Sequence, residues 1–539
     1  MDNIAGAPGG MGSMDEIDLS DFRTPEPPPK YDYDLIIIGS GPAGQKAAMA
    51  AAKNNANVAL VERDPLAGGV CLNTGTIPSK SFREAVLYLT GYRQRGYYGG
   101  SYRLKDKVSA GDLLDRTNHV IRMERSDINE QLVHNNVSRL VGTARLAGPT
   151  DVVINLAGME THYRAPKIII ATGTRTRRPD DVPFDELNVF DSDSVFGQAN
   201  DLRPLPDNII VLGAGVIGIE YASMFAALEI PTILIDPREN PLSFVDNEIA
   251  AVLYSQLKNN GVNLIFGANY KKITVEGDPK DFHSRVHVEL TNGETVSADS
   301  LLFALGRVPT TDNIGLSEAG VALDKRGYVI VDQNTYETNV PGIYAAGDVI
   351  GFPSLASTSA EQGRVAAMGA LGLPVTWHPE SIPYGIYTIP EISQVGKTEQ
   401  QLIEEKVEYY VGTGLWRDTA RGKIVGDLTG ALKMIFTKSD NRLVGVHIIG
   451  EGATELLHIG QAVMHFGGGA DYFVNTVFNY PTLAEAYKIA ARNALNRLIG
   501  KAHHTAPLPQ QLFSDAYPVD WIKWTPTPTN TPLPTPSAL

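Results

Sequence analysis

The 539-residue sequence predicts an α/β fold in which one unit, a strand followed by a glycine-rich loop, a helix and a second strand, occurs twice. In the first copy, apolar strands at 35–38 and 58–62 flank the loop and an alanine-rich helix that starts near Gln45. In the second copy, strands at 209–212 and 232–236 flank the corresponding loop and helix. Short apolar strands that alternate with helices are typical of parallel α/β sheets. Two such units indicate a duplication of fold rather than a short solenoid repeat.

Both glycine loops have the spacing of a loop that binds the pyrophosphate of a dinucleotide. The first glycine makes the tight turn, the second lets the backbone reach the pyrophosphate, and the third allows close packing of helix and strand. The N-terminus of the helix then supplies free N–H groups and the positive end of its dipole. These glycines are Gly39, Gly41 and Gly44 in the first copy and Gly213, Gly215 and Gly218 in the second.

Each second strand ends in an acid that can bind a ribose, Glu62 in the first copy and Asp236 in the second. A glycine-rich turn without a ligand is the alternative for a lone motif, but here strand, loop, helix, strand and acid coincide, so we predict nucleotide binding. Asp236 would hold a 2′-hydroxyl, which favours NAD, whereas Arg238 could meet a 2′-phosphate, which favours NADP. An exposed salt bridge is the alternative for Arg238, so the coenzyme signal is mixed.

Composition argues against several other functions. The formal net charge is −15 with no dense basic cluster, so we expect no nucleic-acid partner. One cysteine, Cys71, excludes an intrachain disulfide scaffold and is compatible with a reducing cytosol. The N-terminus is acidic before Arg23 and lacks the apolar segment of a signal peptide. No run approaches the roughly 18–20 apolar residues of a membrane helix. We therefore expect a cytoplasmic protein without a membrane partner, and we assign no metal site.

Cys71 lies in segment 68–80, GGVCLNTGTIPSK. This segment resembles the active-site segment of the two-dinucleotide flavin disulfide reductases, such as dihydrolipoamide dehydrogenase and glutathione reductase. Those enzymes have a second cysteine where this chain has Thr76, whose hydroxyl can form neither a disulfide nor a readily accessible thiolate. The chain keeps the flavin segment. Because no other cysteine exists, however, it lacks the dithiol relay. In this it resembles the soluble pyridine nucleotide transhydrogenases of the Si-specific type.

A second departure from the disulfide reductases lies in segment 478–485, FNYPTLAE. It resembles the His-Pro…Glu element that enters the active site from the partner subunit in those enzymes. Tyr480 replaces the histidine, and a tyrosine near its reference pKa of about 10 is a poor base at neutral pH. The chain therefore lacks both the second thiol and the histidine base, and these are the two groups that thiol chemistry needs. Segments 382–393 and 473–481 are also similar to the soluble transhydrogenases, and the resemblance spans about 31–500.

The resemblance implies FAD in the first unit and NAD or NADP in the second. Lys80 would lie near the flavin N5, paired with Glu220, where a cation stabilises the electron-rich ring; a solvated lysine is the alternative. Cys71 would be a small, semi-buried residue rather than a redox sensor. Tyr480 would wall the nicotinamide pocket, and it completes a catalytic set with Lys80, Glu220 and Thr76. The other cofactor contacts implied are Gly69, Cys71, Thr172, Gly173, Gly306, Asp348 (on the ribitol) and Ala356, where a helix N-terminus would face the flavin N1/O2 side.

The same resemblance implies the domain order. The predicted bounds are 1–30 for a disordered N-terminal arm, 31–185 and 311–380 for the two parts of the FAD-binding domain, 186–310 for the NAD(P)-binding domain, 381–503 for an α+β dimerisation domain, and 504–539 for a Pro/Thr-rich tail. We expect the tail to be a surface or linker element, although Trp521 and Trp524 could dock on the body.

The activity implied is a homodimeric or larger transhydrogenase that moves hydride between NADPH and NAD⁺ through FAD. One shared nicotinamide pocket implies ping-pong kinetics. A diaphorase or quinone reductase of the same fold needs the same flavin and passes electrons to a small acceptor. A FAD-binding sensor or scaffold without turnover is a further alternative. Lys80, Glu220 and both glycine loops argue against a scaffold, which has no need of a nicotinamide pocket.

Overall fold

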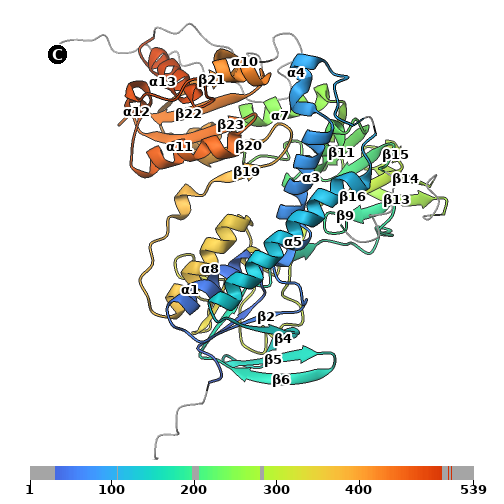
Figure 1. Cartoon of the computed structure of the whole chain (residues 1–539), viewed down its shortest axis with the longest axis vertical. Coiled ribbons are helices and arrows are strands. Elements are labelled where there is room, and N and C mark those ends of the chain that lie inside the picture. Colours follow the sequence, from blue (N-terminus) through green and yellow to red (C-terminus); the bar gives the residue numbers. More distant parts are fainter. Residues whose placement is uncertain are drawn as a thin grey trace, which may run out of the picture.

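The computed structural model describes residues 31–105, 107–196, 205–278 and 284–500, together with residues 508 and 512. The predicted N-terminal arm and nearly all of the tail, including Trp521 and Trp524, lie outside the described residues. Figure 1 shows an elongated molecule with the first nucleotide unit at the lower end and the C-terminal strands and helices at the upper end. Within the described part of the chain, no helix is long and apolar enough to cross a membrane.

The first sheet is parallel and has the strand order β18-β7-β1-β2-β3. Helices α1 (Pro42–Lys53) and α8 (Ala356–Ala370) cover one face, and they pack so closely that a Cβ on Gly363 would lie 2.0 Å from the Ala43 carbonyl oxygen. Helix α1 begins three residues earlier than the sequence predicted. The strands are β1 (Leu35–Ile38), β2 (Val58–Glu62), β3 (Ser138–Val141), β7 (Lys167–Ile170) and β18 (Ile343–Ala345). Strands β4 (Thr143–Leu146), β5 (Asp151–Leu156) and β6 (Met159–Arg164) form a small sheet over the other face.

The second sheet is also parallel, in the order β12-β11-β10-β16-β9, and is inserted between the strands of the first. Its strands are β9 (Val189–Asp191), β10 (Ile209–Leu212), β11 (Thr232–Asp236), β12 (Val262–Phe266) and β16 (Ser300–Phe303). Helices α6 (Val216–Ala227) and α7 (Asn247–Asn259) pack on it, as does the sheet of β13 (Tyr270–Glu276), β14 (Arg285–Leu290) and β15 (Thr295–Ala298). The two strands β8 (Thr174–Thr176) and β17 (Arg307–Pro309) form an antiparallel link between the units.

The C-terminal part is an antiparallel sheet covered by helices. Helix α13 approaches the sheet closely, because Cβ atoms on Gly412 and Gly414 would lie 2.0 and 2.4 Å from carbonyl oxygens of the helix. The strands, in the order β19-β20-β23-β22-β21, are β19 (Tyr384–Ile386), β20 (Ile392–Gly396), β21 (Tyr409–Leu415), β22 (Ala431–Thr437) and β23 (Leu443–Ile449). The helices are α9 (Glu399–Glu404), α10 (Ala420–Val425), α11 (Ala453–His465), α12 (Ala470–Asn475) and α13 (Glu485–Leu498). The predicted fold class, two Rossmann-like units and an α+β domain, is confirmed.

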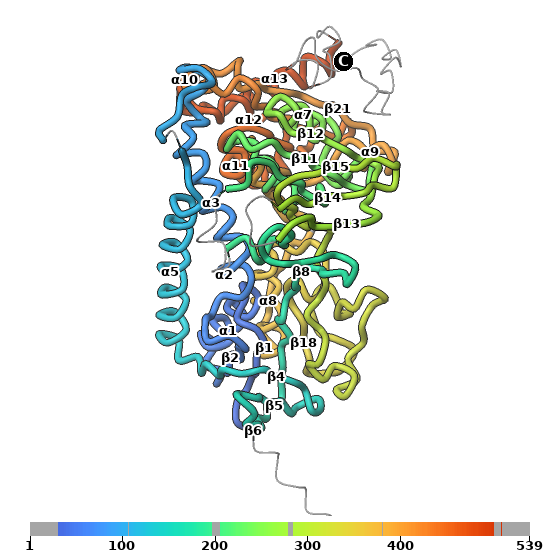
Figure 2. Tube along the Cα trace, turned by 90° about the vertical axis from the view of Figure 1, so that its right-hand side faces the viewer, coloured from blue at the N-terminus to red at the C-terminus, as the bar shows by residue number. Residues whose placement is uncertain are grey.

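Two helices run along one side of the molecule and connect its two ends (Figure 2). They are α3 (Thr76–Leu89), which follows the short α2 (Gly69–Asn73), and α5 (Ala110–His134). A capping box of Ser109 and Asp112 starts α5. Short turns complete the connection at η2 (Tyr92–Gln94) and α4 (Arg95–Tyr98).

A buried charge cluster joins the second unit to the C-terminal sheet. The Lys433 ammonium on β22 lies 2.8 Å from Asp246 and 2.9 Å from Glu248 at the start of α7, and it also pairs with Glu399. These carboxylates are close enough together to hold a metal ion, but the ammonium already lies among them. The Leu508 amide donates to Glu248, and its side chain is fully buried. At this residue the tail therefore differs from the surface or linker element that we predicted.

Candidate dinucleotide site

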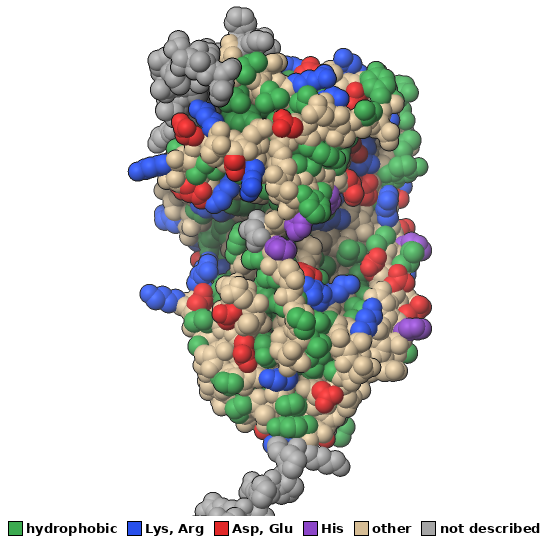
Figure 3. Space-filling model, turned by 90° about the vertical axis from the view of Figure 1, so that its left-hand side faces the viewer, with side chains coloured by type: hydrophobic (Ala, Val, Ile, Leu, Met, Phe, Trp, Pro, Cys, Tyr) green, Lys and Arg blue, Asp and Glu red, His purple; other side chains and the backbone are tan. Residues whose placement is uncertain are grey.

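Both nucleotide units open into one cavity of about 1070 Å³. Figure 3 shows the surface hollowed across the middle of the molecule, between its upper and lower parts. The predicted site residues that line the cavity are Gly39, Gly41, Glu62, Gly69, Cys71, Thr76, Lys80, Thr172, Gly173, Gly213, Gly215, Glu220, Asp236, Arg238, Gly306, Asp348 and Ala356. Gly44, Gly218 and Tyr480 are not among the lining residues.

The two glycine loops have the same geometry. Gly39 and Gly213 have φ values of +106° and +111°, in the region that favours glycine. A Cβ on Gly44 would lie 1.8 Å from the Gly39 carbonyl oxygen, and Gly218 has the same relation to Gly213. A Cβ on Gly41 would have no atom within 4 Å, so this residue leaves open space beside the backbone. The third glycine therefore packs helix against loop, and the second opens a path for a ligand.

Several helices begin at the cavity wall without a capping side chain. Among them are α1 after Gly41, α6 after Gly215 and α8 after Leu355. The first N–H groups of a helix have no partner within the helix, and the positive end of the helix dipole lies there. The cavity thus offers several sites for phosphate or for negative charge on a bound ring.

Glu62 is held in place by the first glycine loop. The Ser40 hydroxyl and amide donate to its Oε2 at 2.6 and 3.0 Å, and the Asp64 amide donates to Oε1 at 3.3 Å. Oε1 thus makes only one long hydrogen bond among the described residues, and it can accept another from a ribose.

Asp236 is much more fully engaged than Glu62. It is completely buried and accepts from the Ala214 amide at 2.7 Å and from the Arg238 amide at 2.9 Å. The Arg238 guanidinium binds it with two further bonds of 2.8 Å, while 52% of that side chain remains exposed. Burial raises the pKa of Asp236, but the bonds from Arg238 and Ala214 outweigh it, so the pKa is lowered. The salt bridge considered for Arg238 is present, and Asp236 itself is the partner.

Asp348 lies at the wall formed by the first unit. Ser359 donates to it at 3.1 Å and Thr174 at 3.4 Å. Burial raises its pKa, although the Ser359 bond and the nearby Arg307 charge oppose the rise. Arg307 spans the link between the units, with bonds of 2.9 and 3.0 Å to Asp193 and 2.9 Å to the Thr174 hydroxyl.

Lys80 and Glu220 meet at the junction of the two units. Lys80 is in the second turn of α3, Glu220 is in α6, and their Nζ and Oε2 atoms are 2.7 Å apart. The lysine is 26% exposed and the glutamate 5%, so the cation faces the cavity and the carboxylate lies behind it. The alternative of a solvated lysine does not fit this geometry.

Cys71 and Thr76 are neighbours at the cavity wall. The Thr76 side chain hydrogen-bonds to the thiol, but burial has the larger effect and raises the pKa of Cys71. No other cysteine exists in the chain. A half-buried thiol with a raised pKa is a weak nucleophile.

Tyr480 lies apart from these groups. It is 74% exposed, in the loop between α12 and α13 of the C-terminal part. Within one chain, Tyr480 is therefore not a wall of the cavity.

The cavity is also lined by residues for which we predicted no role, above all Tyr384 and Tyr387 of the segment 382–393. The Tyr387 amide donates to Glu220 Oε1 at 2.7 Å, and its ring lies 5.0 Å from Lys80 Nζ. The segment was recognisable only by resemblance, because nothing local in its sequence reveals a contact with a residue 167 positions away in the chain.

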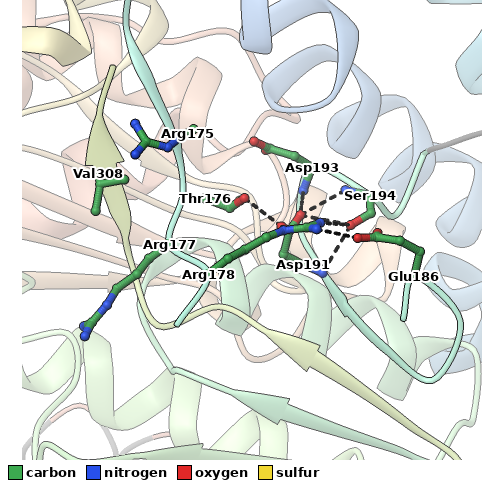
Figure 4. A pocket seen from close by; sticks show the side chains of 9 residues that line it. All are labelled: Arg175, Thr176, Arg177, Arg178, Glu186, Asp191, Asp193, Ser194 and Val308. Atoms are coloured by element: carbon green, nitrogen blue, oxygen red, sulfur yellow. Dashed lines mark hydrogen bonds and ion pairs between the residues drawn. The ribbon is translucent and has the colours of Figure 1, made fainter. Parts of the chain in front are cut away.

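A smaller pocket of about 560 Å³ lies beside the link between the units (Figure 4). Arg178 pairs there with Asp191 at 2.6 Å and with Glu186 at 2.5 Å. Asp191 also accepts from the Thr176 hydroxyl at 2.7 Å. The charges that meet in Figure 4 bind one another, so we assign no ligand to this pocket.

Comparison with known proteins agrees with this geometry. The family model described as pyridine nucleotide-disulphide oxidoreductase matches residues 33–363, and that of its dimerisation domain matches residues 382–491. A soluble pyridine nucleotide transhydrogenase of Mycobacterium tuberculosis is 47% identical over 87% of this chain and 98% of its own length. One from Escherichia coli is 42% identical over 87% of this chain and 100% of its own length.

Solved structures are similar as well. LpdA from Mycobacterium tuberculosis has a TM-score of 0.77 and 27% identity, over 85% of this chain and 99% of its own. The HOCl-induced flavoprotein disulfide reductase RclA from Escherichia coli has a TM-score of 0.75 and 26% identity, over 85% of this chain and 99% of its own. With two glycine loops on one cavity and a family model that covers most of the chain, this protein belongs to the pyridine nucleotide-disulphide oxidoreductase family, among relatives named soluble pyridine nucleotide transhydrogenases.

Proposed function

We propose that this chain is an FAD-dependent NAD(P)⁺ transhydrogenase that moves hydride between NADPH and NAD⁺. One observation carries the proposal: the Lys80–Glu220 pair lies between two dinucleotide loops on one cavity, and Thr76 stands where a second thiol would be needed for a disulfide relay. The transhydrogenase names of relatives at 42–47% identity support the same activity.

The first unit fits FAD. Gly41 leaves room for a pyrophosphate beside the N-terminus of α1, and Glu62 Oε1 can accept from a ribose. Asp348 is placed to bind the ribitol chain, and the N-terminus of α8 at Ala356 lies on the same cavity. When bound, FAD supplies a two-electron centre that can take up and release hydride. Lys80 offers a positive charge there, and Glu220 holds that charge against the wall.

The second unit fits a nicotinamide coenzyme, with Gly215 and the N-terminus of α6 at the pyrophosphate. In our proposal, Arg238 remains paired with Asp236 and turns its exposed edge toward a 2′-phosphate. When NAD⁺ binds, the same Arg238–Asp236 pair makes only a polar contact with the neutral 2′-hydroxyl. Both coenzymes then use one site in turn, which gives ping-pong kinetics.

We further propose a homodimer, in which the loop 476–484 of each subunit reaches the cavity of the other. Tyr480 and Val477 of that loop are 74% and 90% exposed, and Phe466 at the end of α11 is 85% exposed. Glu485 Oε2 is buried and has no hydrogen-bond partner among the described residues. A dimerisation-domain match over residues 382–491 supports this arrangement. The proposed compartment is the cytoplasm.

The decisive experiment reduces the FAD-loaded protein anaerobically with NADPH and then mixes it either with NAD⁺ or with a quinone. We expect NAD⁺ to restore the oxidised flavin spectrum within the turnover time, with one NADH formed per flavin. Reoxidation by the quinone alone would instead identify a diaphorase. No reduction by NADPH or NADH would refute the proposed function.

A further inference from the structure

Tyr387 contacts both members of the Lys80–Glu220 pair. Its amide donates to Glu220 Oε1 at 2.7 Å, while Lys80 binds Glu220 Oε2 at 2.7 Å. Its ring lies 5.0 Å from the Lys80 ammonium. The backbone of one residue therefore fixes the carboxylate, and the side chain of the same residue supports the cation.

The outer edge of the Tyr387 ring is held by the C-terminal part of the chain. The Thr454 side chain, in the first turn of α11, lies beside the phenol end of the Tyr387 ring. Gly385 makes room for this contact, because a Cβ there would lie 3.3 Å from Thr454 Cγ2 and 3.4 Å from the tyrosine ring.

The contacts continue from Thr454 back to α3. Both the Thr454 hydroxyl and its amide donate to Glu391 Oε1, at 3.2 and 3.3 Å. Glu391 Oε2 lies 3.4 Å from the buried guanidinium of Arg83, which also donates to the Thr388 carbonyl oxygen at 3.1 Å. Arg83 and Lys80 are three residues apart on α3, so they share one face of that helix. The contacts form a closed ring that leads from Lys80 through Tyr387 and back to α3.

We propose that Tyr387 is a positioning residue that fixes the Lys80 cation at the cavity wall and connects it to helix α11. The inference rests on the proposed function in one respect, the placement of Lys80 beside the flavin. Lys80 has a long flexible side chain that is 26% exposed, and among the described residues its ion pair is with Glu220 alone. An aromatic face adds an attraction for the ammonium and removes rotamers in which it turns toward solvent.

The consequence concerns the flavin potential. A fixed cation stabilises the electron-rich form of the bound flavin more than a mobile one does. Tyr387→Leu keeps the hydrogen bond from the backbone amide to Glu220 and removes the ring. The midpoint potential of the flavin should therefore become more negative. Tyr387→Phe keeps the ring over Lys80 and should retain most of the wild-type potential. Thr454→Val, which leaves the ring intact, should resemble Tyr387→Phe, and Thr454→Ser should match the wild type.

The experiment titrates the FAD-loaded variants with a chemical reductant and follows the flavin spectrum. Tyr387→Leu should shift the potential, and stopped-flow reduction by NADPH should slow about 3- to 30-fold, the range expected for a lost cation–aromatic contact. The NADPH concentration for half-maximal rate should change little, because the ring contacts the lysine rather than the coenzyme loop. Thermal unfolding and FAD content identify any variant that fails to fold.

A double-mutant cycle separates this role from simple packing. If Tyr387 acts through the cation, Tyr387→Leu should cause no further shift of the potential in a Lys80→Met background. Equal shifts in both backgrounds, or equal shifts for Tyr387→Phe and Tyr387→Leu, would overturn the inference. Because the titration needs neither NADPH nor NAD⁺, it gives an answer even if the protein binds FAD and the proposed transhydrogenation fails.

Discussion

At the scale of single residues, the site owes its chemistry to replacements as much as to retained groups. Thr76 and the single cysteine could be read directly from the sequence, and they exclude a disulfide relay. What the sequence could not give is the surroundings of Cys71. Burial raises the pKa of its thiol, and this depends on helices that pack around α2.

We expect Cys71→Ser to retain transhydrogenation within about 3-fold, because no electron passes through the sulfur. A loss beyond about 10-fold, or roughly 1.4 kcal/mol of barrier, with unchanged FAD content would contradict this. The direction of the pKa shift adds a second check. Because burial raises the pKa, alkylation of Cys71 by iodoacetamide near pH 8 should be slower than that of a free thiol.

Arg238→Ala should weaken NADPH selectively. The variant loses a charge-assisted contact of about 1.5–3 kcal/mol, and it also leaves the Asp236 carboxylate facing the 2′-phosphate. The KM for NADPH should therefore rise at least 10-fold, whereas that for NADH should change less than about 3-fold. Arg145→Ala, which removes an exposed arginine that pairs with Glu160 on the small sheet, serves as the matched control. Equal losses for both coenzymes would assign Arg238 a structural role.

The mixed coenzyme signal shows a limit of sequence reasoning. The types and spacing of Asp236 and Arg238 were visible, and both readings were physically sound. Only the structure shows that the two side chains bind each other, because rotamers of a half-exposed arginine depend on the loop around it. Tyr387 illustrates the same limit over a longer distance, since its partners belong to helices far away in the sequence.

At the scale of elements, the positions of the glycines predicted the nucleotide loops and their flanking elements well. The loops, their strands and the helices that follow occur where the pattern placed them, apart from the earlier start of α1 at Pro42. These features are local, since a short apolar strand and a positive-φ glycine specify their own geometry. The pairing of the C-terminal strands was not predictable in this way, because it depends on contacts between strands that no turn motif fixes.

Gly44→Ala and Gly41→Ala should fail in different ways. A Cβ on Gly44 would lie 1.8 Å from a backbone oxygen, so this variant should lower the melting temperature of the apoprotein by several degrees and also lose FAD. A Cβ on Gly41 meets no atom within 4 Å, so its apoprotein should melt normally while FAD affinity falls. Gly111→Ala, in the first turn of α5 with no neighbour nearer than 3.8 Å, is the neutral control. Calorimetry and flavin release measure both effects, and equal melting of the Gly44 and Gly41 variants would contradict the packing argument.

At the scale of the whole molecule, the Lys433 cluster joins the second unit to the C-terminal sheet. Asp246, Glu248 and Glu399 surround one fully buried ammonium. Despite the effect of burial, these carboxylates raise the pKa of Lys433 well above its usual value. Removing one partner of a buried ion pair leaves uncompensated charge, which is strongly destabilising.

Lys433→Met should therefore reduce the free energy of unfolding by about 3–5 kcal/mol at neutral pH. Without the ammonium, the folded-state pKa values of the carboxylates rise above the unfolded ones, and stability falls as the pH rises through that interval. The deficit relative to the wild type should thus shrink as the pH is lowered from 8 toward 5. Denaturant unfolding at several pH values tests this, and a deficit that does not depend on pH would argue against buried charge as the cause.

The interrupted first sheet has a consequence for synthesis on the ribosome. Strand β7 pairs on one side with β1, which is among the first described residues, and on the other with β18 at 343–345. The entire second unit must leave the exit tunnel before β18 can close the sheet and α8 can cover α1. Until then the apolar strand edge of β7 and the alanine-rich face of α1 are uncovered. Such an intermediate is prone to aggregation and is bound by chaperones. Nascent chains that stop before residue 343 should therefore be unable to retain FAD, however well the inserted unit has folded.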